Sequence, residues 1–90
     1  MKIPRISIPP GMRAVSLRAN VNVAVEPGTH VDVLISGRGA EAQSTILLQD
    51  IELASFEPQA GIVTLLTSPK DAKQLVIATD KGGIEVVPHN

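Results

Sequence analysis

A Pro-Gly pair followed at once by an alternating run of residues is the feature that most constrains the fold of this chain. Pro27 fixes φ at about −65° and Gly28 accepts positive φ, so the pair fits the two central positions of a type II turn. After the turn, Val31, Val33 and Ile35 occupy every second position, which is typical of a strand with a buried face. The sequence therefore predicts a tight turn that leads directly into a core strand.

The composition argues against several classes of function. The chain has 90 residues, which suit a single domain, and its lack of Cys excludes disulfides, thiolate metal sites and cysteine nucleophiles. Its eight Lys and Arg residues are scattered and Phe56 is its one aromatic residue, so no nucleic-acid partner is expected. No apolar run approaches the roughly 20 residues that cross a bilayer, so membrane contact is expected only through an anchor absent from this chain.

Strand-like runs separated by turn residues fill most of the chain. The strands are predicted at residues 13–19, 21–25, 30–35, 44–54, 62–67 and 84–87. The run Val21–Val25 is short and is predicted to be a weak or edge strand. The run 44–54 is too long for one flat strand, so the Gln49-Asp50 pair is predicted to mark a bend or bulge within it.

One helix is predicted after Ser68, a preferred N-cap residue. Pro69 suits the first helical position, Asp71 favours the positive end of the helix dipole, and the pair Gly82-Gly83 supplies a stop. The apolar face of this helix is predicted from residues at helical spacing, namely Ala72, Leu75, Val76 and Thr79.

The order of these elements predicts an α+β fold. We expect a small, mostly antiparallel, β-barrel-like sheet, plugged or covered by one amphipathic helix that precedes the last strand. Residues 1–11 are rich in proline and are expected to form an extended lead-in or linker, and residues 12–90 a single domain.

Two patterns could mark a binding site. His30 and Asp32 share a strand face and could be two metal ligands, but a site needs more ligands and the other histidine, His89, lies at the C-terminus. Residues 37–42 match the Gly-x-Gly-x-x-Ala phosphate-binding pattern after a strand, but strand-like sequence resumes at Thr45 where a helix is required. A solvated strand face and a plain hairpin loop are the preferred interpretations.

No catalytic constellation emerges from the remaining polar residues. The serines include no nucleophile elbow, and Ser68 already has a capping role. Asp50 and Glu52 are interpreted as a solubilising pattern rather than as a general acid and base. The chain is therefore expected not to be an enzyme and to have no catalytic residue, no cofactor and no metal.

Four blocks of the chain, in collinear order, resemble one known family. The blocks are Ile8–Leu17 (IPPGMRAVSL), Val25–Leu34 (VEPGTHVDVL), Thr45–Leu53 (TILLQDIEL) and Val63–Leu75 (VTLLTSPKDAKQL). They resemble the periplasmic domain of the Flp (tight-adherence, type IVb) pilus assembly proteins of the CpaB/RcpC family. The resemblance covers nearly the whole chain.

This resemblance implies a function and a location. Residues 12–90 would be a non-enzymatic periplasmic module, in a parent protein anchored in the inner membrane and carrying a preceding SAF-type β-domain. The module would link the inner-membrane platform to the outer-membrane secretin, with self-association and contact with peptidoglycan as further expectations. The alternative implied function is a SAF-like module that binds a glycan or another small ligand.

The partner surface is expected at the predicted edge strand and at the turn after it. An edge strand offers unpaired amides and carbonyls to which a partner can add a strand. The candidate partner-binding residues are Val21, Val23, Val25, Thr29 and His30.

Overall fold

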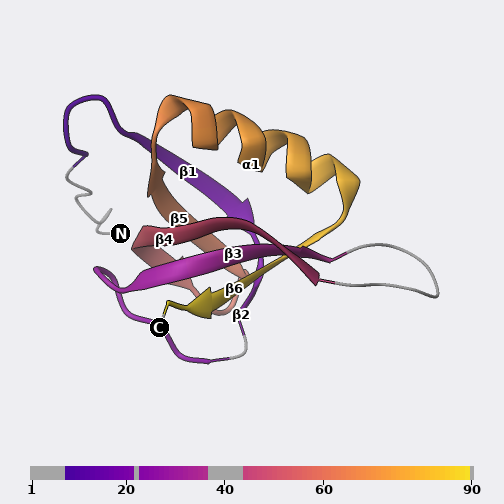
Figure 1. Ribbon diagram of the computed structural model, residues 1–90. Coiled ribbons are helices and arrows are strands. Elements are labelled where there is room, and N and C mark those ends of the chain that lie inside the picture. Colours follow the sequence, from indigo (N-terminus) through magenta and orange to yellow (C-terminus); the bar gives the residue numbers. More distant parts are fainter. Residues whose placement is uncertain (1–7, 22, 37–43, 90) are drawn as a thin grey trace.

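The computed structural model describes residues 8–21, 23–36 and 44–89, which form one sheet and one helix (Figure 1). Along the chain the elements are β1 (Arg13–Arg18), β2 (Asn20–Val21), β3 (His30–Ser36), β4 (Ser44–Glu57), β5 (Ile62–Thr67), α1 (Pro69–Lys81) and β6 (Gly83–Pro88). The predicted α+β class is confirmed. Residues 1–7 of the predicted lead-in and the Gly-x-Gly-x-x-Ala pattern at 37–42 lie outside the described residues.

The sheet is open and strongly curved. Its six strands follow the order β1-β5-β4-β3-β6-β2, and all neighbours are antiparallel except β2 and β6, which are parallel. The two edge strands are joined by Ala19 alone, so Arg18 and Asn20 lie at most about 7 Å apart and the two edges approach each other at that corner. Because β1 and β2 do not pair, the sheet is not a closed barrel, and the expected barrel-like closure is corrected to a curved open sheet.

Irregular pairing in β4 gives the sheet much of its curvature. Asp50 has φ 57°. Between the pairs Val31–Ile51 and Val33–Leu48, β4 contains two residues, Gln49 and Asp50, where β3 contains one, so the predicted bulge is confirmed. Further register shifts leave Leu47 as an extra residue against β3 and Ala54 as an extra residue against β5. Bulges bend a strand and increase its twist, which lets β4 turn from β3 at one side to β5 at the other.

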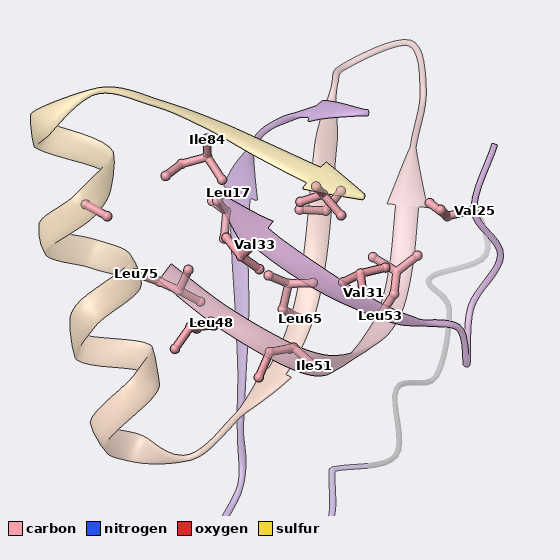
Figure 2. Packing of buried hydrophobic residues seen from close by; sticks show 13 residues of the cluster. Leu17, Val25, Val31, Val33, Leu48, Ile51, Leu53, Leu65, Leu75 and Ile84 are labelled. Carbon is pink, nitrogen blue, oxygen red and sulfur yellow. The ribbon is translucent and has the colours of Figure 1, made fainter. Parts of the chain in front are cut away.

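The core lies inside the curve of the sheet. Val31 and Val33 are fully buried, which confirms the strand predicted after the Pro-Gly turn, and Ile35 is partly buried against them. Figure 2 shows Leu75 of α1 pointing toward the leucines and valines of the sheet. The helix thus covers the core, as predicted.

The helix begins as predicted but buries a different face. Ser68 Oγ accepts a hydrogen bond of 3.1 Å from the Asp71 N–H, which confirms the N-cap. The buried residues are Ala72, Leu75 and Ala78, whereas Val76 is 60% exposed and Thr79 is exposed. The predicted apolar face was therefore wrong at these last two positions. The buried residues are three positions apart, and each such interval shifts the buried row by about 60° around the helix axis, away from Val76 and Thr79.

The predicted turn is confirmed and is held against β4. The Thr29 N–H donates to the Glu26 oxygen at 3.0 Å, and Gly28 has the positive φ, 92°, that a type II turn requires at its third position. The Gly28 N–H donates to the Leu53 oxygen, and the Leu53 N–H donates to the Thr29 oxygen, each at 2.8 Å. The turn therefore fixes the start of β3 beside the middle of β4.

Replacing Gly28 tests this backbone conformation. A Cβ on Gly28 would meet no atom within 4 Å, so the cost of a side chain comes from the backbone alone. We expect Gly28→Val to lower the free energy of unfolding by about 1 kcal/mol or more, and Gly28→Asn to cost less because Asn tolerates positive φ. Urea denaturation measures both, and equal losses would contradict the assigned turn.

Candidate functional site

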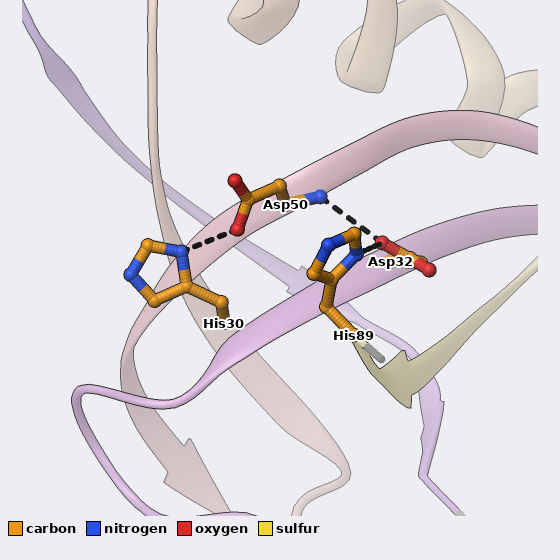
Figure 3. Close-up of polar contacts among 4 residues, drawn as sticks. All are labelled: His30, Asp32, Asp50 and His89. Atoms are coloured by element: carbon orange, nitrogen blue, oxygen red, sulfur yellow. Dashed lines mark hydrogen bonds and ion pairs between the residues drawn. The ribbon is translucent and has the colours of Figure 1, made fainter.

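Two histidines and two aspartates meet where β3, β4 and the end of β6 lie side by side (Figure 3). His30 Nδ1 lies 2.6 Å from Asp50 Oδ1, and His89 Nδ1 lies 2.7 Å from Asp32 Oδ1. The Asp50 N–H donates to the same Asp32 oxygen at 3.0 Å. We call these four residues the His-Asp cluster.

The bulge in β4 explains why the cluster forms. At the bulge the residue Asp50 has no register partner on β3, so its N–H needs another acceptor, and the carboxylate of Asp32 supplies it. The His89 N–H donates to the His30 oxygen at 2.9 Å, which extends the pairing of β6 with β3 past Pro88. This backbone bond places the His89 ring beside Asp32.

The electrostatics of the cluster centre on Asp32. The Asp50 N–H and then the hydrogen bond from His89 hold the pKa of Asp32 below its usual value of 3.8. The same contact raises the pKa of His89 above its usual value of 6.5. The other pair is weaker, since the side chains of His30 and Asp50 are 53% and 59% exposed and exposed ion pairs contribute little.

These shifts predict a stability window in mildly acidic solution. The lowered pKa of Asp32 contributes stability above pH 3.8 that is lost as the pH falls through its folded-state pKa. The raised pKa of His89 contributes stability below pH 6.5 that is lost as the pH rises through its folded-state pKa. The wild-type protein should therefore exceed His89→Ala in melting temperature most clearly at about pH 5, and by less at about pH 9.

Thermal melts of the two proteins across this range check the prediction. In an Asp32→Asn background, removal of His89 should have nearly the same effect at every pH. A difference between wild type and His89→Ala that grows toward alkaline pH would contradict the assigned pair.

The cluster differs from the metal pair considered from the sequence. His30 and Asp32 do share a strand, but each contacts a different partner, Asp50 and His89 respectively. Among the described residues no group of three or more His, Cys, Asp or Glu side chains is arranged to hold a metal ion. From the sequence, the place of His89 at the C-terminus argued against it as a ligand, and no local pattern brings it to Asp32, which lies 57 residues away along the chain.

A hollow of about 280 Å³ lies next to the cluster. The polar residues of its lining are His30, Asp50 and Glu52 from β3 and β4, Thr67 at the end of β5, and Ser68 and Asp71 at the start of α1. Pro9, Met12, Ile51 and Leu66 are among its apolar lining residues. The polar lining is rich in carboxylates, so it offers hydrogen-bond acceptors more than donors.

The five residues predicted to bind a partner have different environments. Val21 is half-buried in β2, which comprises Asn20 and Val21 alone, and the edge strand predicted to reach Val25 is corrected to this length. Val25 is 9% exposed and belongs to the hydrophobic core, so it is not available to a partner. Val23 is 55% exposed, Thr29 is half-buried in the turn, and His30 is exposed in the His-Asp cluster.

The available Val21, Val23, Thr29 and His30 form what we call the β2 edge. Val21 pairs with Val86, while Val31, next to His30, pairs with Pro88 further along the same strand β6. β6 therefore lies between β2 and β3, and because Val21 and Val33 both pair with Val86, Val21 lies across β6 from Val33. Figure 1 shows β2 at the lower side of the molecule, the side on which the C-terminus also lies.

Comparison with models of protein families, with curated proteins and with solved structures finds no match to this chain. In the described part of the chain, α1 is too short and too polar to span a bilayer.

Proposed function

We propose that this chain is a non-enzymatic interaction module of a type IVb (Flp) pilus assembly protein of the CpaB/RcpC kind. It acts in the periplasm, within a parent protein anchored in the inner membrane, and links the inner-membrane platform to the outer-membrane secretin. The proposal is supported by the four collinear sequence blocks that resemble this family and by an α+β fold with the predicted turn and helix.

The observation that carries the proposal is the β2 edge. β2 is the last strand in the sheet order, so one side of its backbone has no strand partner among the described residues. Val23, just beyond it, exposes 55% of its surface. A strand edge without a strand partner, beside an exposed apolar side chain, is what a strand-adding partner uses.

The glycan-binding alternative depends on the hollow beside the His-Asp cluster. A sugar needs donors and acceptors held ready, but His30 is already bonded to Asp50, and Ser68 Oγ accepts the Asp71 N–H. The remaining polar side chains of the lining are carboxylates and the hydroxyl of Thr67, which has no hydrogen-bond partner among the described residues but is fully buried. No Trp or Tyr is available for stacking. The hollow therefore supports glycan binding less well than the β2 edge supports a protein contact.

The test replaces Val23 with Asp in the full-length parent protein. Because Val23 is exposed, the variant should fold normally, while the new charge at the β2 edge should abolish co-purification with the secretin and reduce pilus assembly. Lys70→Glu is the control, since Lys70 is exposed on α1 and this change alters the net charge more. Normal pilus assembly by a folded Val23→Asp parent would contradict the proposal.

A separate titration addresses the alternative. Nuclear magnetic resonance spectra recorded with soluble peptidoglycan fragments should show no saturable shifts at residues that line the hollow. Saturable shifts there, together with normal assembly by Val23→Asp, would favour the glycan-binding module.

A further inference from the structure

The outward face of α1 carries a continuous stripe of exposed residues. Lys73, Val76, Ile77 and Asp80 lie at the spacing i, i+3, i+4 and i+7, which places them on one side of a helix. Val76 is 60% exposed and Ile77 48% exposed, while Leu75 on the opposite side is fully buried. We call these four residues the α1 stripe.

The order of residues within the stripe is self-complementary. The two aliphatic residues occupy its centre, with Lys73 three positions before Val76 and Asp80 three positions after Ile77. A two-fold axis between Val76 and Ile77 would bring the α1 stripes of two copies together in antiparallel fashion. Val76 of each copy would then face Ile77 of the other, and Lys73 would face the partner's Asp80.

We propose that the α1 stripe is a self-association surface on which the helices of two copies of this chain pack antiparallel. The charges select this arrangement, because a parallel pair would place Lys73 against the partner's Lys73 and Asp80 against the partner's Asp80. An antiparallel pair replaces both repulsions with attractions and also opposes the two helix dipoles. Aliphatic side chains at the centre of such a contact leave water on association.

The size and position of the stripe define how it would act. A contact of about two helical turns is small, so isolated domains should associate weakly. Figure 1 shows α1 at the top of the molecule and β2 at the lower side, so a partner on β2 would leave the α1 stripe free. The inference therefore goes beyond the pilus proposal and does not depend on it.

Sedimentation equilibrium of the 90-residue chain, from micromolar to near-millimolar concentration, tests the proposal. We expect a monomer–dimer equilibrium for the wild type and a dissociation constant at least about tenfold higher for Val76→Asp. Val76 is exposed, so circular dichroism should show an unchanged fold. A wild-type chain that stays monomeric throughout, or a Val76→Asp variant that dimerises like the wild type, would overturn the proposal.

Charge reversal tests the antiparallel arrangement itself. Lys73→Glu and Asp80→Lys should each weaken dimerisation, since each single change creates two like-charge pairs across the axis. The double variant should dimerise as the wild type does, and an equimolar mixture of the two single variants should form a mixed dimer. Failure of the double variant to recover dimerisation would overturn the antiparallel packing.

Discussion

Leu75→Ala should lower the free energy of unfolding by about 2–5 kcal/mol, which is a large part of the stability of a domain this size. Leu75 is fully buried, with 0% of its surface exposed to solvent. It is the large side chain that α1 contributes to the core of the sheet (Figure 2). Its truncation would leave a cavity between the helix and the strands. The change should be visible in urea or thermal denaturation as an early, still cooperative transition.

The neighbouring residue provides the matched control. Val76→Ala removes apolar atoms one position further along the same helix, but Val76 is 60% exposed. It should alter the free energy of unfolding by no more than about 0.5 kcal/mol. Similar decreases in the free energy of unfolding for both variants would contradict the orientation of α1, in which Leu75 is buried and Val76 exposed.

Gly82→Ala should cost about 1–3 kcal/mol, because the added methyl group has no space. Gly82 has φ 179°, an extended conformation open to any residue, so the cost does not come from backbone strain. A Cβ at this position would instead run into the backbone oxygen of Ser36, where the end of β3 passes the junction between α1 and β6. The end of β3 or the junction at Gly82 must move for the side chain to fit.

Gly83→Ala is the comparison for this prediction. Gly83 pairs with Ser36 at the start of β6, yet a Cβ on it would meet no atom within 4 Å. We expect a change within about 0.5 kcal/mol of wild type. Equal melting temperatures for Gly82→Ala and Gly83→Ala would contradict the close approach of Ser36 to Gly82.

The features predicted correctly from the sequence depend on neighbouring residues. The conformational preferences of Pro27 and Gly28 alone specify the turn, and Ser68 with Asp71 defines the start of α1. The bulge at Asp50 follows from a polar pair that interrupts a long aliphatic strand. Such short-range signals survive folding because tertiary contacts reinforce them.

The features missed from the sequence depend on long-range contacts. The contact between His89 and Asp32 requires the register of β6 on β3, which no local pattern specifies. Likewise, β2 ends after Val21 and Val25 turns into the core, although the alternation of valines suggested one continuous edge strand. The rotation of α1, which exposes Val76, is set by its packing on a curved sheet.

The central proposal is that the β2 edge contacts another component of a pilus assembly machine. The most direct measurement places a photo-cross-linking amino acid at position 23 of the full-length parent protein, in cells that assemble pili, and repeats this at position 70 on α1. Position 23 should yield an adduct with the secretin, and position 70 should not. Absence of any adduct between position 23 and a pilus assembly protein, in cells that still make pili, would contradict the account.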